Sequence, residues 1–287
     1  TAQVKAMTSD QVAVLTTGQL QSLSTTQVQA IDTADVAAMT STQIKALSNT
    51  ELSGMTTAQV AALTSDQIKS VTTAALAGLS TAQVAGLTTS QVAALSATQV
   101  QAMETADVAA LSATQAQALS TAQVAALSTS QVQAMSTAGV SGLTTDAIKG
   151  LSSNQLQAMT TDGVAALTTT QVGALGTAQV AALTSSEAAA LTTTQVQALS
   201  TAQVKALEVG DLAAMSTAQV AALTTTQVGA LTAAQVSNLT TDQVAALTTA
   251  QVRALTSDQL SKLSSDQVAL MATDDIAAIS TAQISHL

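Results

Sequence analysis

Large aliphatic residues recur along the chain with a period of eight. From Met7 onward the sequence divides into octads of the form aliphatic, Ser/Thr, Ser/Thr, x, Gln, Val, x, Ala, and the frame reaches Leu287 without an insertion or deletion. Residues 7–286 number 280 and so make 35 complete octads. The first aliphatic residue is position one, and position six is Val, Ile or Leu in all octads but those with Ala116 and Ala188. Positions one and six are therefore the predicted core.

The polar positions of the octad predict a short helix. Position two is Ser or Thr in 30 of the 35 octads, and position five is Gln in 25. A hydroxyl followed three residues later by Gln is the capping box, in which each side chain bonds the other residue's backbone N–H. With Ser200 as the N-cap, for example, Leu199 and Val204 have the spacing of a hydrophobic staple. We expect each octad to form one helix of six or seven residues.

Charge placement supports helices, because a helix start favours acids and a helix end favours bases. Six of the seven bases lie at position seven and Lys262 lies at position eight. All 17 acids lie at position two (Asp32, Glu104, Glu208), position four (Asp10, Asp66, Asp146, Asp162, Asp242, Asp258, Asp266, Asp274) or position five (Asp35, Glu51, Asp107, Glu187, Asp211, Asp275).

One continuous helix is excluded by the period. Eight residues advance an apolar stripe by about 80° beyond two turns, so the stripe would circle the helix within about five octads. A β-solenoid is the alternative fold, since eight-residue strands with Thr ladders can stack. Against it, positions one and six have opposite parity and would face opposite sides of a flat strand. The acid and base segregation would also have no explanation.

The predicted fold class is therefore all-α: a solenoid of very short capped helices, one per octad, with positions one and six inside. We expect residues 1–287 to form a single continuous array. The chain starts inside an octad at Thr1 and has no initiator Met, so we interpret it as a fragment of a longer array. Position eight is Ala, Gly or Ser in 30 octads, which favours a close approach of the next helix. The number of octads per turn and the hand stay open.

Composition narrows the function. The chain has no Cys, Phe, Tyr, Trp or Pro, and it has one His. We predict no enzyme activity, no catalytic residues, no cofactor and no metal site, because the residues for acid, base or nucleophile chemistry are missing. A net charge of −10 argues against nucleic acid as a partner. Hydroxyl and amide residues interrupt every octad, so we expect no transmembrane helix.

A few features have a functional and a structural interpretation. Three acid pairs, Asp32 with Asp35, Glu104 with Asp107 and Glu208 with Asp211, could hold a cation, but acids also suit a first helical turn. We favour the second interpretation. All eight Met residues lie at position one, which indicates a core rather than a binding groove.

Four glycines weaken the helical pattern between Met135 and Ala166: Gly139, Gly142, Gly150 and Gly163. We interpret them as tolerated drift in a redundant array, with a flexible joint as the alternative. Asn238-Leu239-Thr240 matches a glycosylation sequon that chance explains in a Thr-rich chain. His286 is interpreted as solvated.

The motif Leu-Thr-Thr-x-Gln-Val-x-Ala, at Leu167–Ala174 and Leu191–Ala198, resembles repeat tracts of very large bacterial secreted or cell-surface proteins, often adhesin-like. The resemblance covers the whole chain and implies an extracellular, extended structural role. We therefore expect a rod, spacer or self-associating fibre element that packs laterally or end to end with copies of itself. The alternative is a surface-binding repeat in which position-three hydroxyls, as in Thr193 and Thr201, recognise an ice or polysaccharide lattice.

Overall fold

The computed structural model describes residues 1–285, and this part of the chain is all-α, with 36 helices and no strand. Each octad forms one helix that begins at position three and ends at position six, seven or eight. The expected all-α solenoid of short capped helices is confirmed. The helices are somewhat shorter than expected, at four to six residues, because the last one or two residues of many octads form a turn.

The chain divides into two compact units, Thr1–Leu151 and Ser152–Leu287, which we describe separately. The expectation of a single array stays a prediction. The helices of unit 1 are α1 (Ala2–Lys5), α2 (Ser9–Ala13), α3 (Thr17–Gln21), α4 (Thr25–Val28), α5 (Thr33–Ala38), α6 (Ser41–Ala46), α7 (Asn49–Gly54), α8 (Thr57–Ala62), α9 (Ser65–Ser70), α10 (Thr73–Ala77), α11 (Thr81–Ala85), α12 (Thr89–Ala94), α13 (Ala97–Gln101), α14 (Thr105–Ala109), α15 (Ala113–Gln117), α16 (Thr121–Ala125), α17 (Thr129–Ala134), α18 (Thr137–Gly142) and α19 (Thr145–Lys149).

Unit 2 continues the same pattern. Its helices are α20 (Ser153–Gln157), α21 (Thr161–Ala166), α22 (Thr169–Ala174), α23 (Thr177–Ala181), α24 (Ser185–Ala190), α25 (Thr193–Ala198), α26 (Thr201–Ala206), α27 (Val209–Ala214), α28 (Thr217–Ala222), α29 (Thr225–Ala230), α30 (Ala233–Ser237), α31 (Thr241–Ala245), α32 (Thr249–Ala254), α33 (Ser257–Leu260), α34 (Ser265–Ala269), α35 (Thr273–Ala278) and α36 (Thr281–Ile284).

The N-cap of most helices is built as the capping box predicts. In α26 the Ser200 hydroxyl accepts from the Gln203 N–H, while the Gln203 Oε1 accepts from the Ser200 N–H. Ser200 has φ −70° and ψ 160°, so the chain is extended for one residue before the helix begins. Each cap therefore both starts a helix and turns the chain away from the previous one.

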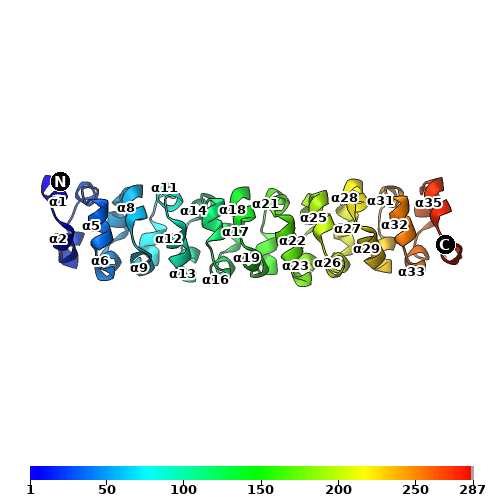
Figure 1. Ribbon diagram of the computed structural model, residues 1–287, viewed down its shortest axis with the longest axis horizontal. Coiled ribbons are helices and arrows are strands. Elements are labelled where there is room, and N and C mark those ends of the chain that lie inside the picture. Colours follow the sequence, from blue (N-terminus) through cyan, green and yellow to red (C-terminus); the bar gives the residue numbers. More distant parts are fainter. Residues whose placement is uncertain (286–287) are drawn as a thin grey trace. The chain divides into compact units, whose positions relative to one another are not determined.

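The turn of the solenoid takes between three and four octads. Within each unit, packing contacts join helices that are three places apart, as α22 packs against α25 in unit 2. The same helix α22 also accepts hydrogen bonds from Gln203 of α26, four places along. In Figure 1 helices α21, α25, α28, α31 and α35 of unit 2 accordingly recur along one edge, three or four helices apart.

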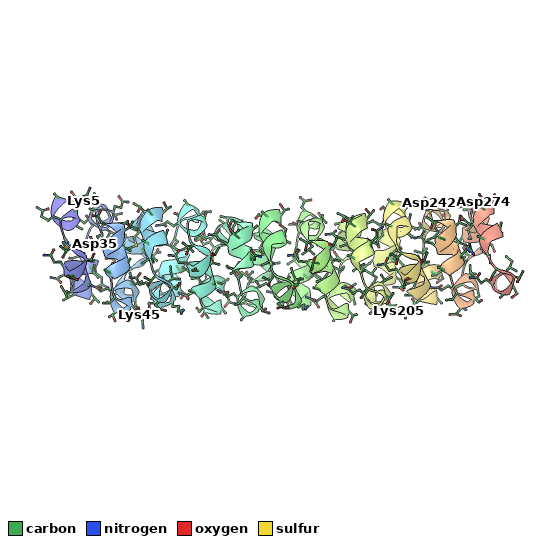
Figure 2. The ribbon with its side chains drawn as sticks, viewed as in Figure 1. Lys5, Asp35, Lys45, Lys205, Asp242 and Asp274 are labelled. Carbon is green, nitrogen blue, oxygen red and sulfur yellow. The ribbon has the colours of Figure 1, made fainter. Side chains whose placement is uncertain are left out.

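The core of each unit consists of positions one and six, as expected. Within unit 2, Val204 is fully buried and Leu199 and Leu207 are 4% and 3% exposed. Charged residues at positions four and seven point outward, and Figure 2 places Lys205 on one edge of unit 2 and Asp242 and Asp274 on the other. Helices this short do not form alone in water, since nucleation is costly. Burial of two aliphatic residues per octad and the caps hold them.

Candidate functional site

The most unusual site in the fold is a polar one, repeated along the inside of each unit. The position-five side chain of nearly every octad is buried beneath the neighbouring turn; Gln203 in α26 is 2% exposed. Its Oε1 accepts from the N–H of its own N-cap at 2.7 Å. Its Nε2 donates to the carbonyl oxygens of Val172 and Leu175, at 2.9 and 2.8 Å. We call this buried site the position-five slot.

The slot joins the start of one helix to the end of another. Helix ends leave carbonyl groups without an intrahelical partner, and buried groups of this kind must be satisfied. A Gln in the slot supplies the missing donor to the carbonyl 28 residues earlier, with distances between 2.5 and 2.9 Å. One amide side chain therefore caps its own helix and bonds it to the preceding turn of the solenoid.

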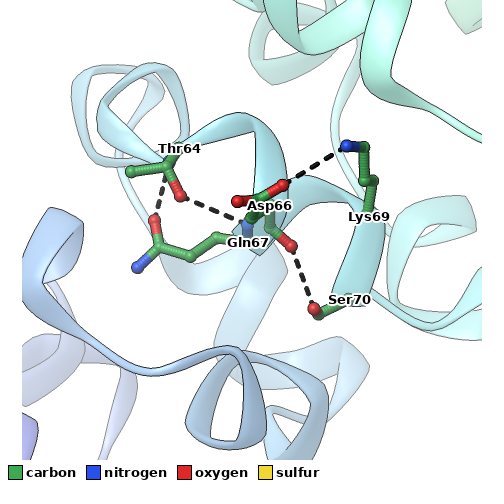
Figure 3. A network of polar contacts seen from close by, with 5 residues as sticks. All are labelled: Thr64, Asp66, Gln67, Lys69 and Ser70. Carbon is green, nitrogen blue, oxygen red and sulfur yellow. Dashed lines mark hydrogen bonds and ion pairs between the residues drawn. The ribbon is translucent and has the colours of Figure 1, made fainter.

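The charged side chains outside the slot contribute little to stability. In α9, drawn in Figure 3, Gln67 and Thr64 form the box on one side, while Lys69 and Asp66 pair at 3.3 Å on the other. The side chains of Lys69 and Asp66 are 58% and 84% exposed. Exposed pairs of this kind contribute only about 0–1 kcal/mol. The charges at positions four and seven thus lie on the surface.

Four aspartates occupy the slot and bond across the turn in another way. Asp35, Asp211 and Asp275 each accept from a position-three hydroxyl 26 residues earlier, at 2.7, 2.9 and 2.8 Å. Asp107 accepts in the same way from Thr81. Position-five acids are therefore buried residues of the turn contact, and the interpretation of them as simple first-turn charges misses this.

The acid pairs do not act as pairs. Asp35, Asp107 and Asp211 are buried, whereas their partners Asp32, Glu104 and Glu208 are exposed N-caps. None of these three caps accepts a side-chain cap hydrogen bond. The acids at these three cap positions therefore do not cap their helices through their side chains. Aspartate in the slot is one methylene shorter than Gln, and no box forms in any of these three helices.

Glu187 in α24 occupies the slot with the length of Gln but without its donor. Its Oε2 accepts from the Thr184 N–H and hydroxyl, at 2.7 and 2.8 Å. Its Oε1 is buried without a hydrogen-bond partner, and so are Oδ2 of Asp107 and Oδ2 of Asp211. Burial raises the pKa of all three carboxyl groups above the ordinary range. All three carboxyl groups therefore lie in surroundings that disfavour their charged forms.

The other sequence features are structural. Seven of the eight Met residues are buried core residues, which confirms the core interpretation: Met39, Met55, Met103, Met135, Met159, Met215 and Met271. Thr193 and Thr201 are exposed. Asn238 is exposed, and in its sequon the Thr240 hydroxyl already accepts from the Gln243 N–H. His286 lies outside the described residues.

The glycines differ from one another. A Cβ added to Gly142 would lie 2.6 Å from the Ala113 Cα of α15, so α18 and α15 approach too closely for any side chain there. At Gly142 the interpretation of tolerated drift is wrong. Position eight is small because it contacts position three of the octad 29 residues earlier, as Gly54 contacts Thr25. The close approach is therefore to the helix three places earlier, and not to the next helix as expected.

Residues 1–285 contain no pocket and no group of three or more His, Cys, Asp or Glu that could hold a metal ion. Within the same residues, no helix has the length and apolar character needed to cross a membrane.

A protein-family profile described as the ALTTAQ repeat matches ten segments of the chain. They are residues 1–25, 15–49, 41–73, 66–97, 100–137, 137–169, 154–185, 161–193, 204–241 and 238–273. Together the matches cover residues 1–97, 100–193 and 204–273, which is most of the sequence. No curated protein matches the chain.

Proposed function

Because the chain belongs to the ALTTAQ repeat family, with matches along most of its length, we propose that it is a structural repeat segment that acts as a rod, spacer or fibre element. The observation that carries this proposal is the local contact pattern within each unit. Within each unit, packing contacts join helices three places apart, and the slot hydrogen bonds reach the end of the helix four places earlier at a fixed 28-residue interval. Added octads would extend such an array without changing its core.

Small-angle X-ray scattering of the 287-residue chain tests the proposal. A compact globule of this length has a radius of gyration of about 19 Å. We expect a value well above that, with a skewed distance distribution, and we expect an insertion of whole octads in unit 2 to lengthen the particle in proportion. A value near that of the globule would refute the spacer function.

The remaining parts of the proposal concern context. We propose a bacterial extracellular or cell-surface location of adhesin-like type, on the resemblance of Leu167–Ala174 to such tracts, and no enzyme activity. Surface labelling of intact cells should modify the exposed Lys205, and labelling only after lysis would contradict the location. We also propose association with copies of itself, which sedimentation at rising concentration tests.

Recognition of an ice or polysaccharide lattice is the second candidate. The exposed Thr193 and Thr201 at position three favour it, since they lie on neighbouring helices and take no part in capping. Thermal hysteresis in the chain, lost on Thr193→Val and Thr201→Val together, would support it. The absence of any ice shaping or polysaccharide retention would leave the spacer function alone.

A further inference from the structure

A Gln that is buried in the slot has two requirements. One side-chain atom must accept from the cap N–H, and the other must donate to the carbonyls 31 and 28 residues earlier. In the octad after Glu187, Gln195 accepts from the Thr192 N–H at 2.6 Å and donates to the carbonyls of Val164 and Leu167, at 3.0 and 2.6 Å. An ionised carboxylate has only acceptors, so it meets the first requirement and not the second.

Glu187 occupies this slot with one carboxyl oxygen hydrogen-bonded and the other without a hydrogen-bond partner. Its Oε2 accepts from the Thr184 N–H, as Gln Oε1 does from its cap elsewhere, and its Oε1 is buried without a hydrogen-bond partner. By the interval of the other slots, the carbonyls opposite are those of Leu156, at 187 − 31, and Met159, at 187 − 28, in and just after α20. Two acceptors cannot bond unless one of them carries a proton.

We propose that Glu187 is held as the neutral carboxylic acid in the folded chain, that its Oε1–H donates to the carbonyls at the end of α20, and that loss of this proton loosens α24 from α20. The contact is thus a pH-sensitive joint within unit 2. In the other slots the corresponding hydrogen bonds come from a Gln amide, which does not titrate.

The charges around Glu187 all favour the neutral form. On α27, Asp211 is buried and Glu208 is an exposed cap; on α21, Asp162 is exposed. The helices α20 and α28, which complete the surroundings, carry no titratable residue. Burial raises the pKa of the Glu187 carboxyl above its ordinary value of 4.5, the Thr184 N–H and hydroxyl lower it, and Asp211 raises it further.

The direction of the pH effect follows from linkage. The folded state keeps the proton to a higher pH than the unfolded state does, so the stabilisation is complete below pH 4.5 and is lost as the pH rises through the folded pKa. Between these values the opening equilibrium of one proton-linked contact shifts by about tenfold per pH unit. Unit 2 should therefore open more readily at α20 and α24 as the solution becomes less acidic.

Amide hydrogen exchange of the whole chain, compared with Glu187→Gln at each pH, tests the proposal. The ratio of the two exchange rates in α20 and α24 cancels the intrinsic pH dependence of exchange. We expect a ratio near one at the acidic end, a rise of about tenfold per pH unit above it, and then a plateau. The exposed Glu104→Gln is the matched control and should leave these ratios flat.

A second variant tests whether a Glu introduced into another slot creates the same pH dependence there. Gln195→Glu should transfer the pH dependence to α21, whose carbonyls then lose their donor. Carbon-13 chemical shifts of the Glu187 carboxyl, assigned with Glu187→Gln, should report its titration directly. A flat exchange ratio for Glu187→Gln, or a carboxyl that titrates in the ordinary glutamate range, would overturn the proposal.

Discussion

Gln203→Ala should remove the slot hydrogen bonds that join two neighbouring turns of unit 2 and so lower its stability. It removes the acceptor of the Ser200 N–H and the donor to the carbonyls of Val172 and Leu175. Each such hydrogen bond contributes about 0.5–1.5 kcal/mol net, and a buried group left without a partner costs about 1–3 kcal/mol. We expect the free energy of unfolding of unit 2 to fall by about 3–5 kcal/mol.

Urea unfolding followed by circular dichroism at the helical band measures the effect. Gln197→Ala in the preceding helix is the matched control, because it is the same chemical change at an exposed position seven, and it should alter stability by less than about 0.5 kcal/mol. The variant should still fold, since Ala147 already occupies the slot of α19. An equal effect of Gln203→Ala and Gln197→Ala would refute the cross-turn function of the slot.

Three further changes test the cap, the buried acid and the close helix contact. Ser200→Ala should lower stability by about 0.5–2 kcal/mol, whereas Glu104→Ala, whose cap makes no bond, should change it by less than about 0.5 kcal/mol in urea unfolding. Burial raises the pKa of the Asp211 carboxyl above its ordinary value of 3.8. The neutral form therefore stabilises unit 2 below that pH, and this stabilisation is lost as the pH rises through the folded pKa. Asp211→Asn should have the same melting temperature as the parent chain at pH 3 and a higher one at pH 7. Gly142→Ala should destabilise unit 1 by about 1–3 kcal/mol, because its Cβ meets the backbone of Ala113, while Gly18→Ala, with open space, should stabilise α3 by about 0.5–1 kcal/mol in thermal melts.

The local structure was predictable from sequence because capping and the hydrophobic staple act within one octad. Ser200 and Gln203 are three residues apart, so their mutual bonds need no knowledge of the rest of the fold. The same holds for the burial of Leu199, which lies just before the cap of α26, and of Val204 within α26. These features fixed the helical class before any contact between octads was considered.

The contact between turns was not predictable in the same way, because the period of eight says nothing about how many octads complete a turn. One signal was nevertheless present. A capping box accepts Glu as readily as Gln, yet the slot holds Gln in 25 octads and Glu only at Glu51 and Glu187. Such a bias indicates that the side chain must also donate, and donation to the carbonyls of Val172 and Leu175 is the reason.

The two sets of hydrogen bonds that each slot Gln makes also explain why the octad frame contains no insertions or deletions. Gln203 must meet its own cap three residues before it and a carbonyl 28 residues before it at the same time. One extra residue anywhere between Leu175 and Ser200 would keep the cap but move that carbonyl out of register. Since the slots overlap along the chain, a single insertion would disturb every slot whose interval includes it, which is about three octads. Substitutions, by contrast, change one slot at a time, and the chain tolerates Asp, Glu, Ala and Gly there.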